Sequence, residues 1–446
     1  MSLLSKLVSK DSFGVLRHRN FSFYLIAKLI GTLAVQMQGV AVGWQVYSLT
    51  GSLFDLGLIG LAQFAPFIVL VLPAGQMADR FNRRNIIFGC FALQFVCALL
   101  LFSLSFVGLT SAWPVFAVLT LFGAARAFSM PAQQAIIMNL VPQAEFGQAV
   151  AISSSSFHVA VIVGPTLGGL CYLAGATTVY GITGALLCLS ALLTWLMHTT
   201  RQASTDASGS AQSRSVLEGL RFVWSRPSML GAISLDLFAV LFGGAVALLP
   251  AYAHDVLHAG PTALGLLRTA PAVGSALVAL VLAFKPIRRH IGAWMFGGVA
   301  VFGGATILMG LTTSFTVALI ALLLTGVGDM VSVYIRHILV QTETPDAIRG
   351  RVSAVNAVFI GASNELGEFE SGLAAGWFGL LPAIVIGGVA TLAVTAIWMW
   401  RFPVLTRMDR FPHAEAEEKA QDKKRQYAQQ EDAESLAELD TAKASV

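Results

Sequence analysis

Charged residues are scarce in this sequence. Asp, Glu, Lys and Arg together make up 12% of its 446 residues, about half of the share of roughly 25% in an ordinary soluble domain. Hydrophobic residues make up 56%, so too few charges remain to cover the surface of a soluble protein of this size. The composition excludes a large soluble enzyme and favours a protein that spans a lipid bilayer.

Cysteine is also rare, and several patterns that carry enzyme chemistry are missing. The four cysteines all fall inside apolar runs, where we interpret them as small packing residues: Cys90, Cys97, Cys171 and Cys188. No phosphate-binding glycine loop, zinc-protease helix or hydrolase nucleophile elbow is present. His254 and His258 have the spacing of a metal site on a helix, but only Asp255 accompanies them. We therefore expect no enzyme activity, no metal and no cofactor.

Apolar runs of bilayer length, separated by short polar stretches, fill most of the chain. Inside hydrocarbon every backbone N–H and C=O needs an internal partner, so each run is best interpreted as a helix. The alternating pattern of a transmembrane barrel is absent. The sequence predicts twelve spans, at 21–48, 54–77, 86–108, 113–139, 148–174, 177–199, 228–253, 263–284, 293–312, 316–340, 352–378 and 381–401.

Lysine and arginine are missing from one side of the predicted membrane protein. Six loops on that side contain neither residue, near 49–53, 109–112, 175–176, 254–262, 313–315 and 379–380. Because cytoplasmic loops carry the excess of Lys and Arg, both termini and the central loop are predicted to be cytoplasmic. The first apolar run is long and contains Lys28, so we expect no cleaved signal peptide.

The chain divides into two similar halves. Adding 203 to the numbering carries Gly123, Pro142 and Gly147 onto Gly326, Pro345 and Gly350, at equivalent places in the two halves. Transporters are often built from such repeats, with the substrate site between them. We predict a cytoplasmic N-terminal segment, a six-helix bundle, a cytoplasmic linker, a second six-helix bundle and a cytoplasmic tail, at 1–20, 21–199, 200–227, 228–401 and 402–446.

The loop between the second and third spans resembles the signature loop of the major facilitator superfamily. A glycine, an Asp-Arg pair and a basic pair stand at the spacing of that loop, and Asn82 replaces its second glycine. Asn tolerates the left-handed backbone that glycine usually supplies. The resemblance implies a latch between the halves at the cytoplasmic face, formed by Gly75, Asp79, Arg80, Arg83 and Arg84.

The fifth span resembles the exporter element of the same superfamily. It contains Gly164, Pro165, Gly168 and Gly169, although small residues of this kind also serve generic helix packing. Over residues 15–400 the chain is similar to the branch with enterobactin-type siderophore exporters and macrolide-efflux-like proteins, through Arg19, Asn20, Phe21, Gln341 to Pro345, Gly350 and Arg351. The resemblance implies an all-α major facilitator fold in a bacterial inner membrane.

Charges inside the predicted spans are the candidate site residues. Each costs at least a few kcal/mol at the bilayer centre unless it is paired or faces a cavity. The first half contributes two basic residues, Lys28 and Arg126, whereas the second half contributes the proton-coupling candidates Glu368, Asp329, Asp236 and Glu365. Arg268 and Arg336 accompany them. The alternative is that these charges form fixed ion pairs that orient the helices.

These observations favour a secondary active exporter of a small organic molecule, siderophore-like or drug-like, driven by proton antiport through alternating access. Uptake symport, lipid flipping and a membrane sensor that no longer translocates are the alternatives. The expected partners are the small-molecule substrate and the lipid bilayer, without nucleic acid, and the expected state is monomeric. Protons are the expected coupling ion.

Overall fold

The computed structural model describes residues 10–198, 218–345 and 348–412, and within this part of the chain every regular element is helical. Most of the predicted linker 200–227 and the tail beyond residue 412 therefore lie outside the described residues. The first half consists of α2 (Arg19–Thr50), α3 (Leu53–Arg80), α4 (Arg83–Val107), α5 (Trp113–Ile136), α6 (Phe146–Cys171) and α7 (Ala176–Leu196).

The second half begins with a broken span, formed by α9 (Pro227–Phe242), η5 (Ala245–Leu248), α10 (Leu249–Ala251) and η6 (Tyr252–Val256). Its remaining long helices are α11 (Pro261–Phe284), α12 (Ile291–Leu311), α13 (Phe315–Glu343), α14 (Arg349–Phe378) and α15 (Leu380–Arg401), and the short α16 (Pro403–Thr406) follows. Eleven spans in the described residues are long and apolar enough to cross a membrane, and the charged α14 is the twelfth. The predicted all-α architecture of about twelve transmembrane helices is confirmed.

Short turns set the helix boundaries at the end of the molecule where the loops contain no Lys or Arg. Gly51 ends α2 in the left-handed region, with φ of 60°, and its N–H donates to the carbonyl of Tyr47. One residue later, the side chain of Ser52 accepts a hydrogen bond of 3.2 Å from the N–H of Asp55 and caps α3. The chain thus reverses between two transmembrane helices within two residues, because glycine tolerates this backbone conformation.

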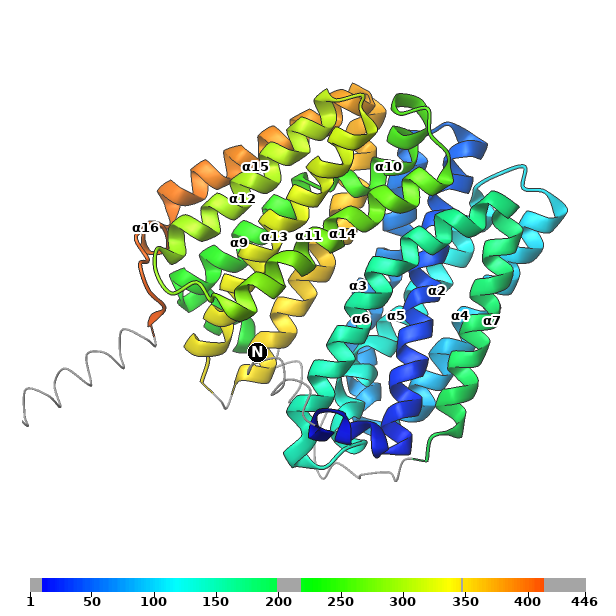
Figure 1. Ribbon diagram of the computed structural model, residues 1–446, viewed down its shortest axis with the longest axis horizontal. Helices are drawn as coiled ribbons and strands as arrows, with labels where there is room; N and C mark the ends of the chain where they lie inside the picture. Colours follow the sequence, from blue (N-terminus) through cyan, green and yellow to red (C-terminus); the bar gives the residue numbers. More distant parts are fainter. Residues whose placement is uncertain (1–9, 199–217, 346–347, 413–446) are drawn as a thin grey trace, which may run out of the picture.

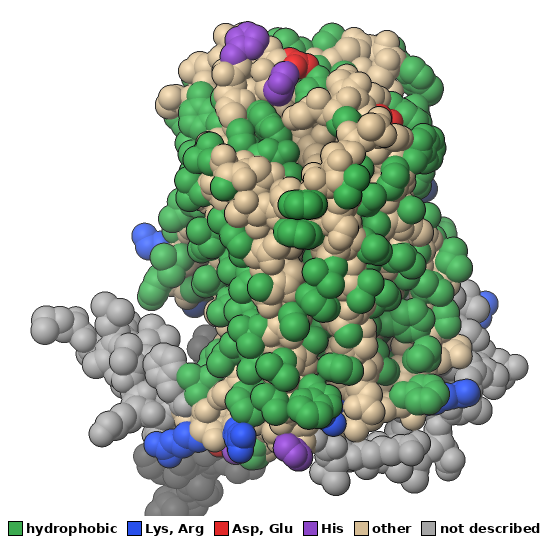
Figure 2. Space-filling model, turned by 90° about the vertical axis from the view of Figure 1, so that its right-hand side faces the viewer, with side chains coloured by type: hydrophobic (Ala, Val, Ile, Leu, Met, Phe, Trp, Pro, Cys, Tyr) green, Lys and Arg blue, Asp and Glu red, His purple; other side chains and the backbone are tan. Residues whose placement is uncertain are grey.

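The surface matches a bilayer environment. Figure 2 shows hydrophobic side chains over the middle of the first half, with Lys and Arg near its lower end. Large apolar side chains stand exposed in this half, including Phe106 at 75% and Val107 at 85%, the last two residues of α4. In a soluble protein such exposure would promote aggregation, whereas in a membrane these side chains contact lipid.

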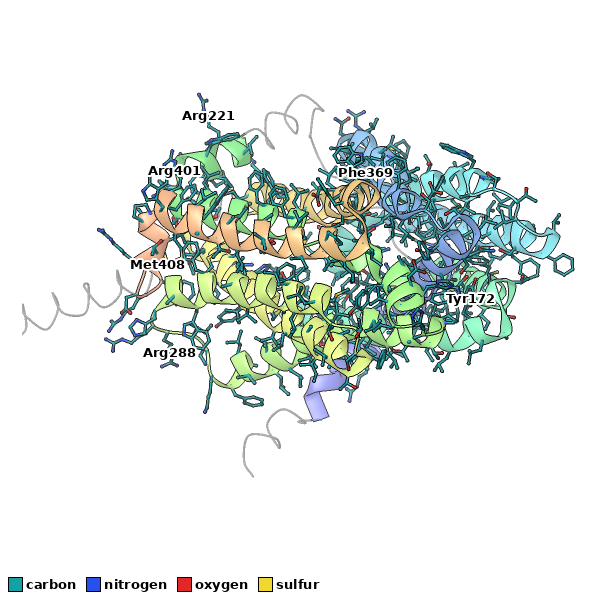
Figure 3. The ribbon with its side chains drawn as sticks, turned by 90° about the horizontal axis from the view of Figure 1, so that it is seen from above. Tyr172, Arg221, Arg288, Phe369, Arg401 and Met408 are labelled. Atoms are coloured by element: carbon teal, nitrogen blue, oxygen red, sulfur yellow. The ribbon has the colours of Figure 1, made fainter. Side chains whose placement is uncertain are left out.

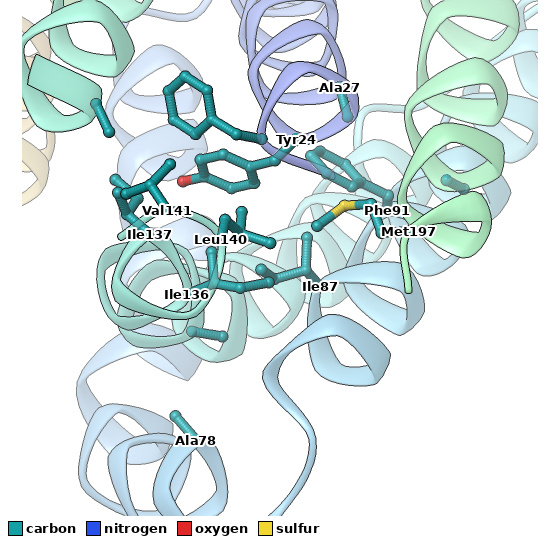
Figure 4. Packing of buried hydrophobic residues seen from close by; sticks show 14 of the residues in the cluster. Tyr24, Ala27, Ala78, Ile87, Phe91, Ile136, Ile137, Leu140, Val141 and Met197 are labelled. Carbon is teal, nitrogen blue, oxygen red and sulfur yellow. The ribbon is translucent and has the colours of Figure 1, made fainter. Parts of the chain in front are cut away.

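Each half has its own apolar packing. In the first half, Tyr24, Ile87, Phe91, Ile136 and Met197 belong to one buried cluster (Figure 4), and the Tyr24 hydroxyl donates to the carbonyl of Gln133 at 2.8 Å. In the second half, α12 packs against α13 and α15, and α14 packs against α9. These clusters fix the helices that carry the charged side chains.

The halves meet chiefly through two helix pairs, α3 with α14 and α6 with α11. In Figure 1 the ribbons of the two halves come together at the top and diverge toward the bottom, where α2 begins. Seen from above, Phe369 of α14 lies where the halves meet (Figure 3), and its ring packs edge-on against Phe54 of α3. We call the end with Arg83 and Arg288 the basic end, and the other end the opposite end.

Candidate functional site

A cavity of about 340 Å³ opens among the helices of the second half, and we call it the C-half cavity. Its lining comes from that half except for Val161 of α6. The charged side chains in its wall are Asp236 from α9, Arg268 from α11, Asp329 and Arg336 from α13, and Glu368 from α14. The structure thus brings together three of the four predicted proton-coupling candidates, and the fourth, Glu365, lies outside this lining.

The wall of the C-half cavity includes a break in the broken span. Helix α9 ends at Phe242, and Gly243 and Gly244 separate it from η5. Glycines also let α9 and α14 approach, because a Cβ atom at Gly367 would lie 2.9 Å from the carbonyl oxygen of Val240. An interrupted helix frees backbone carbonyls inside the membrane, which is tolerated where they face a cavity or other protein.

Asp236 and Arg336 form a buried ion pair in the wall of the cavity. Their side chains are only 5% and 3% exposed, so each charge depends on the other for compensation. Removing one partner of such a pair typically costs about 3 to 5 kcal/mol, because the remaining charge stays buried and unpaired. Arg336 therefore has a buried partner within its own half, and whether the pair stays fixed during transport remains a prediction.

A second ion pair crosses between the halves. Arg126 of α5 donates to the carboxylate of Glu365 on α14. Arg126, a basic candidate of the first half, is therefore paired with Glu365, a proton-coupling candidate of the second half. Asp329 lines the C-half cavity together with Asp236 and Arg336 of its own half.

Lys28, the other predicted basic residue, is held within the first half. Its Nζ donates to the hydroxyl of Ser153 on α6 at 2.8 Å and lies 6.0 Å from the ring centre of Tyr24. Ser153 is itself buried, so α6 supplies a polar partner for a charge inside the membrane. Lys28 does not line the C-half cavity.

The exporter element lies at a contact between the halves. Gly164 and Gly168 face α2, and Gly169 faces Gly265 of α11, where an added Cβ atom would lie 3.1 Å from the Gly265 Cα. Pro165 takes part in the same crossing through its carbonyl oxygen, which would block a side chain at Gly265. Adding 203 carries Gly169 onto Gly372, which faces Gly57 of α3 in the other helix pair. The two crossings are thus built on corresponding glycines.

Two basic residues of the predicted latch, Arg83 and Arg84, bind within the first half. Arg83 donates to the carbonyl of Ala135 at 3.0 Å and to the side chain of Asn139 at 2.7 Å. Arg84 donates to the carbonyl of Thr194 at 3.1 Å. Gly75 and Arg80 lie in the last turns of α3, and the side chain of Asp79 lies outside the part that the structure describes. A latch between the halves remains a prediction.

A contact at the opposite end joins the halves and was not predicted from the sequence. The hydroxyl of Tyr47 on α2 donates to Asp255 of η6, and His254 bonds to the same carboxylate at 2.7 Å. The rings of Trp44 and Tyr47 both pack edge-on against His254. No group of three or more His, Cys, Asp or Glu side chains suited to a metal occurs in the described part of the chain.

In the described residues, about twelve membrane helices form two halves and place charged side chains in a cavity inside the membrane. This arrangement defines a transporter of the major facilitator superfamily. The chain belongs to the family of transmembrane secretion effectors, whose family model it matches over residues 10–431. As the family and its named relatives are transporters, the chain is not an enzyme.

Two relatives carry names of exporters. The chain is 28% identical over 379 residues to the multidrug efflux pump Tap of Mycolicibacterium fortuitum, covering 79% of this chain and 90% of that protein. It is 25% identical over 407 residues to the enterobactin exporter EntS of Escherichia coli O81, covering 86% and 94%. Among solved structures, a bacterial homologue of the human lysosomal transporter Spinster, in an inward-facing and unoccupied conformation, matches with a TM-score of 0.69 and 17% identity. The match covers 87% of this chain and 96% of that chain. At this identity it supports the fold alone.

Proposed function

We propose that this multi-pass membrane protein exports a small organic molecule from the bacterial cytoplasm in exchange for protons, by alternating access between its two halves. The observation that carries the proposal is the position of Glu368. Its carboxyl group lies in the wall of the C-half cavity and against Gly60 of α3 in the other half, where a Cβ atom at Gly60 would lie 3.1 Å from the Glu368 Oε2.

A carboxyl group at a contact between two moving halves suits proton coupling. When the halves close around it, water leaves and the charged form becomes costlier relative to the neutral form. Closure around Glu368 therefore favours a bound proton, and opening favours its release. Asp329 supplies a second carboxyl group in the same cavity.

The arrangement of the halves supports loading from the cytoplasm. The contact between Tyr47 and Asp255 joins the halves at the opposite end, and the ribbons diverge toward the basic end (Figure 1). By the excess of Lys and Arg on cytoplasmic loops, the basic end faces the cytoplasm, as do both termini. In this proposal the bundles 21–199 and 228–401 move as two units, and Asp79, Arg80, Arg83 and Arg84 close the basic end. The names of Tap and EntS support the direction of export.

The test uses inverted membrane vesicles with an imposed proton gradient and monodansylcadaverine, a fluorescent small organic amine, as the probe. Glu368→Gln keeps the volume of the side chain but cannot release a proton, so it should abolish protein-dependent concentrative movement of the probe and leave passive exchange intact. Glu370→Gln, on the same helix but outside the cavity lining, is the matched control and should behave as the wild type. Concentrative export by both Glu368→Gln and Asp329→Asn would contradict coupling through these residues.

A further inference from the structure

A small hollow lies beside the C-half cavity. It measures about 10 Å³ and is lined by three polar side chains, Asp236, Asp329 and Ser332, and by Ala239, Val240, Val299 and Phe302. Asp236, Asp329, Val240 and Phe302 line both spaces. The hollow is therefore a recess of the cavity with room for a single group about the size of a water molecule.

The hydroxyl of Ser332 indicates that this recess binds a ligand. Its side chain is 2% exposed, and its Oγ has no hydrogen-bond partner within the described residues. A buried hydroxyl without a hydrogen-bond partner destabilises the folded protein, so a bound group that fills the recess would supply the missing hydrogen bond. Ser332 follows Asp329 by three residues on α13, which places both side chains on the same face of the helix.

The charges around the cavity leave an excess that a cation would balance. Its lining contains the carboxylates of Asp236, Asp329 and Glu368 and the guanidinium groups of Arg268 and Arg336. Three negative and two positive groups, when all are ionised, sum to −1. Asp236 is paired with Arg336, whereas Asp329 forms no direct ion pair with a described residue. In the open state, which favours release of the Glu368 proton, one monovalent cation beside Asp329 would make the cavity neutral.

We propose that Asp329, Ser332 and Asp236 bind the primary ammonium group of an amine substrate, whose apolar body occupies the C-half cavity. This inference rests on the proposed function, since it takes the cavity as the place where the cargo binds. An ammonium group has three N–H donors, which match three oxygen-bearing side chains. The recess is too small for a trimethylammonium group, and Phe302 in its wall adds an aromatic ring that favours a cation.

The larger cavity suits the remainder of such a molecule. Apolar side chains from several helices line it, among them Val240 of α9, Met309 of α12, Leu322 of α13 and Ile360 of α14. Its volume of about 340 Å³ lies in the range of small-molecule sites. The substrate class is therefore a lipophilic primary amine rather than a polyanion or a quaternary cation.

The test measures equilibrium binding of monodansylcadaverine, a fluorescent primary amine, to the purified full-length protein in detergent. Its N-acetyl and N,N,N-trimethyl derivatives keep the fluorescent body, but the first lacks the charge and the second lacks the N–H donors. We expect saturable binding of the amine and binding of both derivatives that is weaker by about tenfold or more, because charged hydrogen bonds to buried groups are lost.

Variants separate the recess from the apolar cavity. Asp329→Asn should weaken amine binding by about tenfold and Ser332→Ala by a smaller factor, of about threefold, and neither should alter binding of the N-acetyl derivative. That unchanged binding also reports that each variant is folded. Glu370→Gln, outside the lining of both spaces, should bind all three probes as the wild type does.

Equal affinity for the three probes, or unchanged amine binding by Asp329→Asn, would overturn the assignment and leave the recess as a water site. The titration is made without a proton gradient, so its failure would not affect proton coupling. A protein that binds the amine through Asp329 but moves no protons would contradict the proposed coupling alone.

Discussion

Arg126 of α5 and Glu365 of α14 form an ion pair that joins the two halves of the molecule. The Arg126 side chain is 47% exposed and that of Glu365 is 12% exposed, so water screens the pair. Ion pairs of this exposed kind contribute at most about 1 kcal/mol. The pair can therefore break and form again as the halves move, unlike the buried pair of Asp236 and Arg336.

Reversing this pair tests its role between the halves. Arg126→Glu alone places two carboxylates together and should lower the transport rate by about tenfold through like-charge repulsion. The double variant Arg126→Glu with Glu365→Arg should recover most of the rate, because the opposite charges face each other again. Transport rates normalised to protein amount provide the measurement. A double variant no better than the single one would exclude a direct pairing role.

The glycine crossing of α3 and α14 should be intolerant of side chains. A Cβ atom at Gly372 would collide with the backbone of Gly57, so Gly372→Ala should separate the halves at the opposite end and lower both transport and the melting temperature. Gly304→Ala on α12 is the matched control, since no atom lies within 4 Å of its added Cβ. There alanine should be neutral or stabilise the helix by up to about 1 kcal/mol. Equal effects of both changes would show that close approach at Gly372 is unimportant.

Breaking the buried pair should destabilise the second half. Arg336→Met leaves the carboxylate of Asp236 buried without its partner and should lower the free energy of unfolding by about 3 to 5 kcal/mol. The double variant Asp236→Leu with Arg336→Met removes both charges and should regain most of this loss. Thermal unfolding in detergent measures both changes. Similar melting temperatures for the single variant and the wild type would contradict the burial of this pair.

Asp79→Asn tests the predicted latch. Asparagine has nearly the same volume as aspartate, so we expect normal folding and insertion but slower turnover, because loss of the charge weakens closure of the basic end. Turnover in reconstituted vesicles is the measurement, and expression level is the control for folding. Wild-type turnover would remove Asp79 from the transport cycle.

Cysteine labelling tests the orientation. In a background with the four native cysteines replaced by alanine, a membrane-impermeant maleimide added to whole cells should label Ser314→Cys and spare Arg288→Cys. Both side chains are exposed, at opposite ends of the second half. Permeabilised cells should show labelling at both positions. The reverse pattern in whole cells would invert the proposed orientation.

The helices and the set of charged candidates could be predicted from the sequence, because hydrophobic length and the cost of charge in lipid are local properties. The predicted span 263–284 corresponds to α11 at Pro261–Phe284, and 381–401 corresponds to α15 at Leu380–Arg401. The sequence also marked Asp236, Asp329 and Glu368, which the fold gathers into one cavity.

The ion pairs between side chains of different helices could not be predicted, because they depend on how the helices rotate and cross. Adding 203 to the numbering relates Arg126 to Asp329, whereas Arg126 forms its ion pair with Glu365. Ser332 could not be singled out as a ligand-binding residue, since a serine in a membrane helix usually bonds back to its own backbone. Only the packing of α13 shows that its hydroxyl faces the recess and has no partner among the described residues. Tyr47 and Asp255 are likewise brought together by the docking of the halves.

The charged character of α14 has a consequence for how the protein is made. Among the long helices of the described residues, α14 carries two arginines near its start and three glutamates, and it falls short of the apolar content of the other spans. A segment of this kind partitions poorly into lipid by itself. Its charges are accommodated by α5, α11 and the cavity, so its stable insertion during synthesis should depend on the earlier helices already being in the membrane. Chains from which α3 and α5 have been deleted should therefore fail to retain α14 across the bilayer.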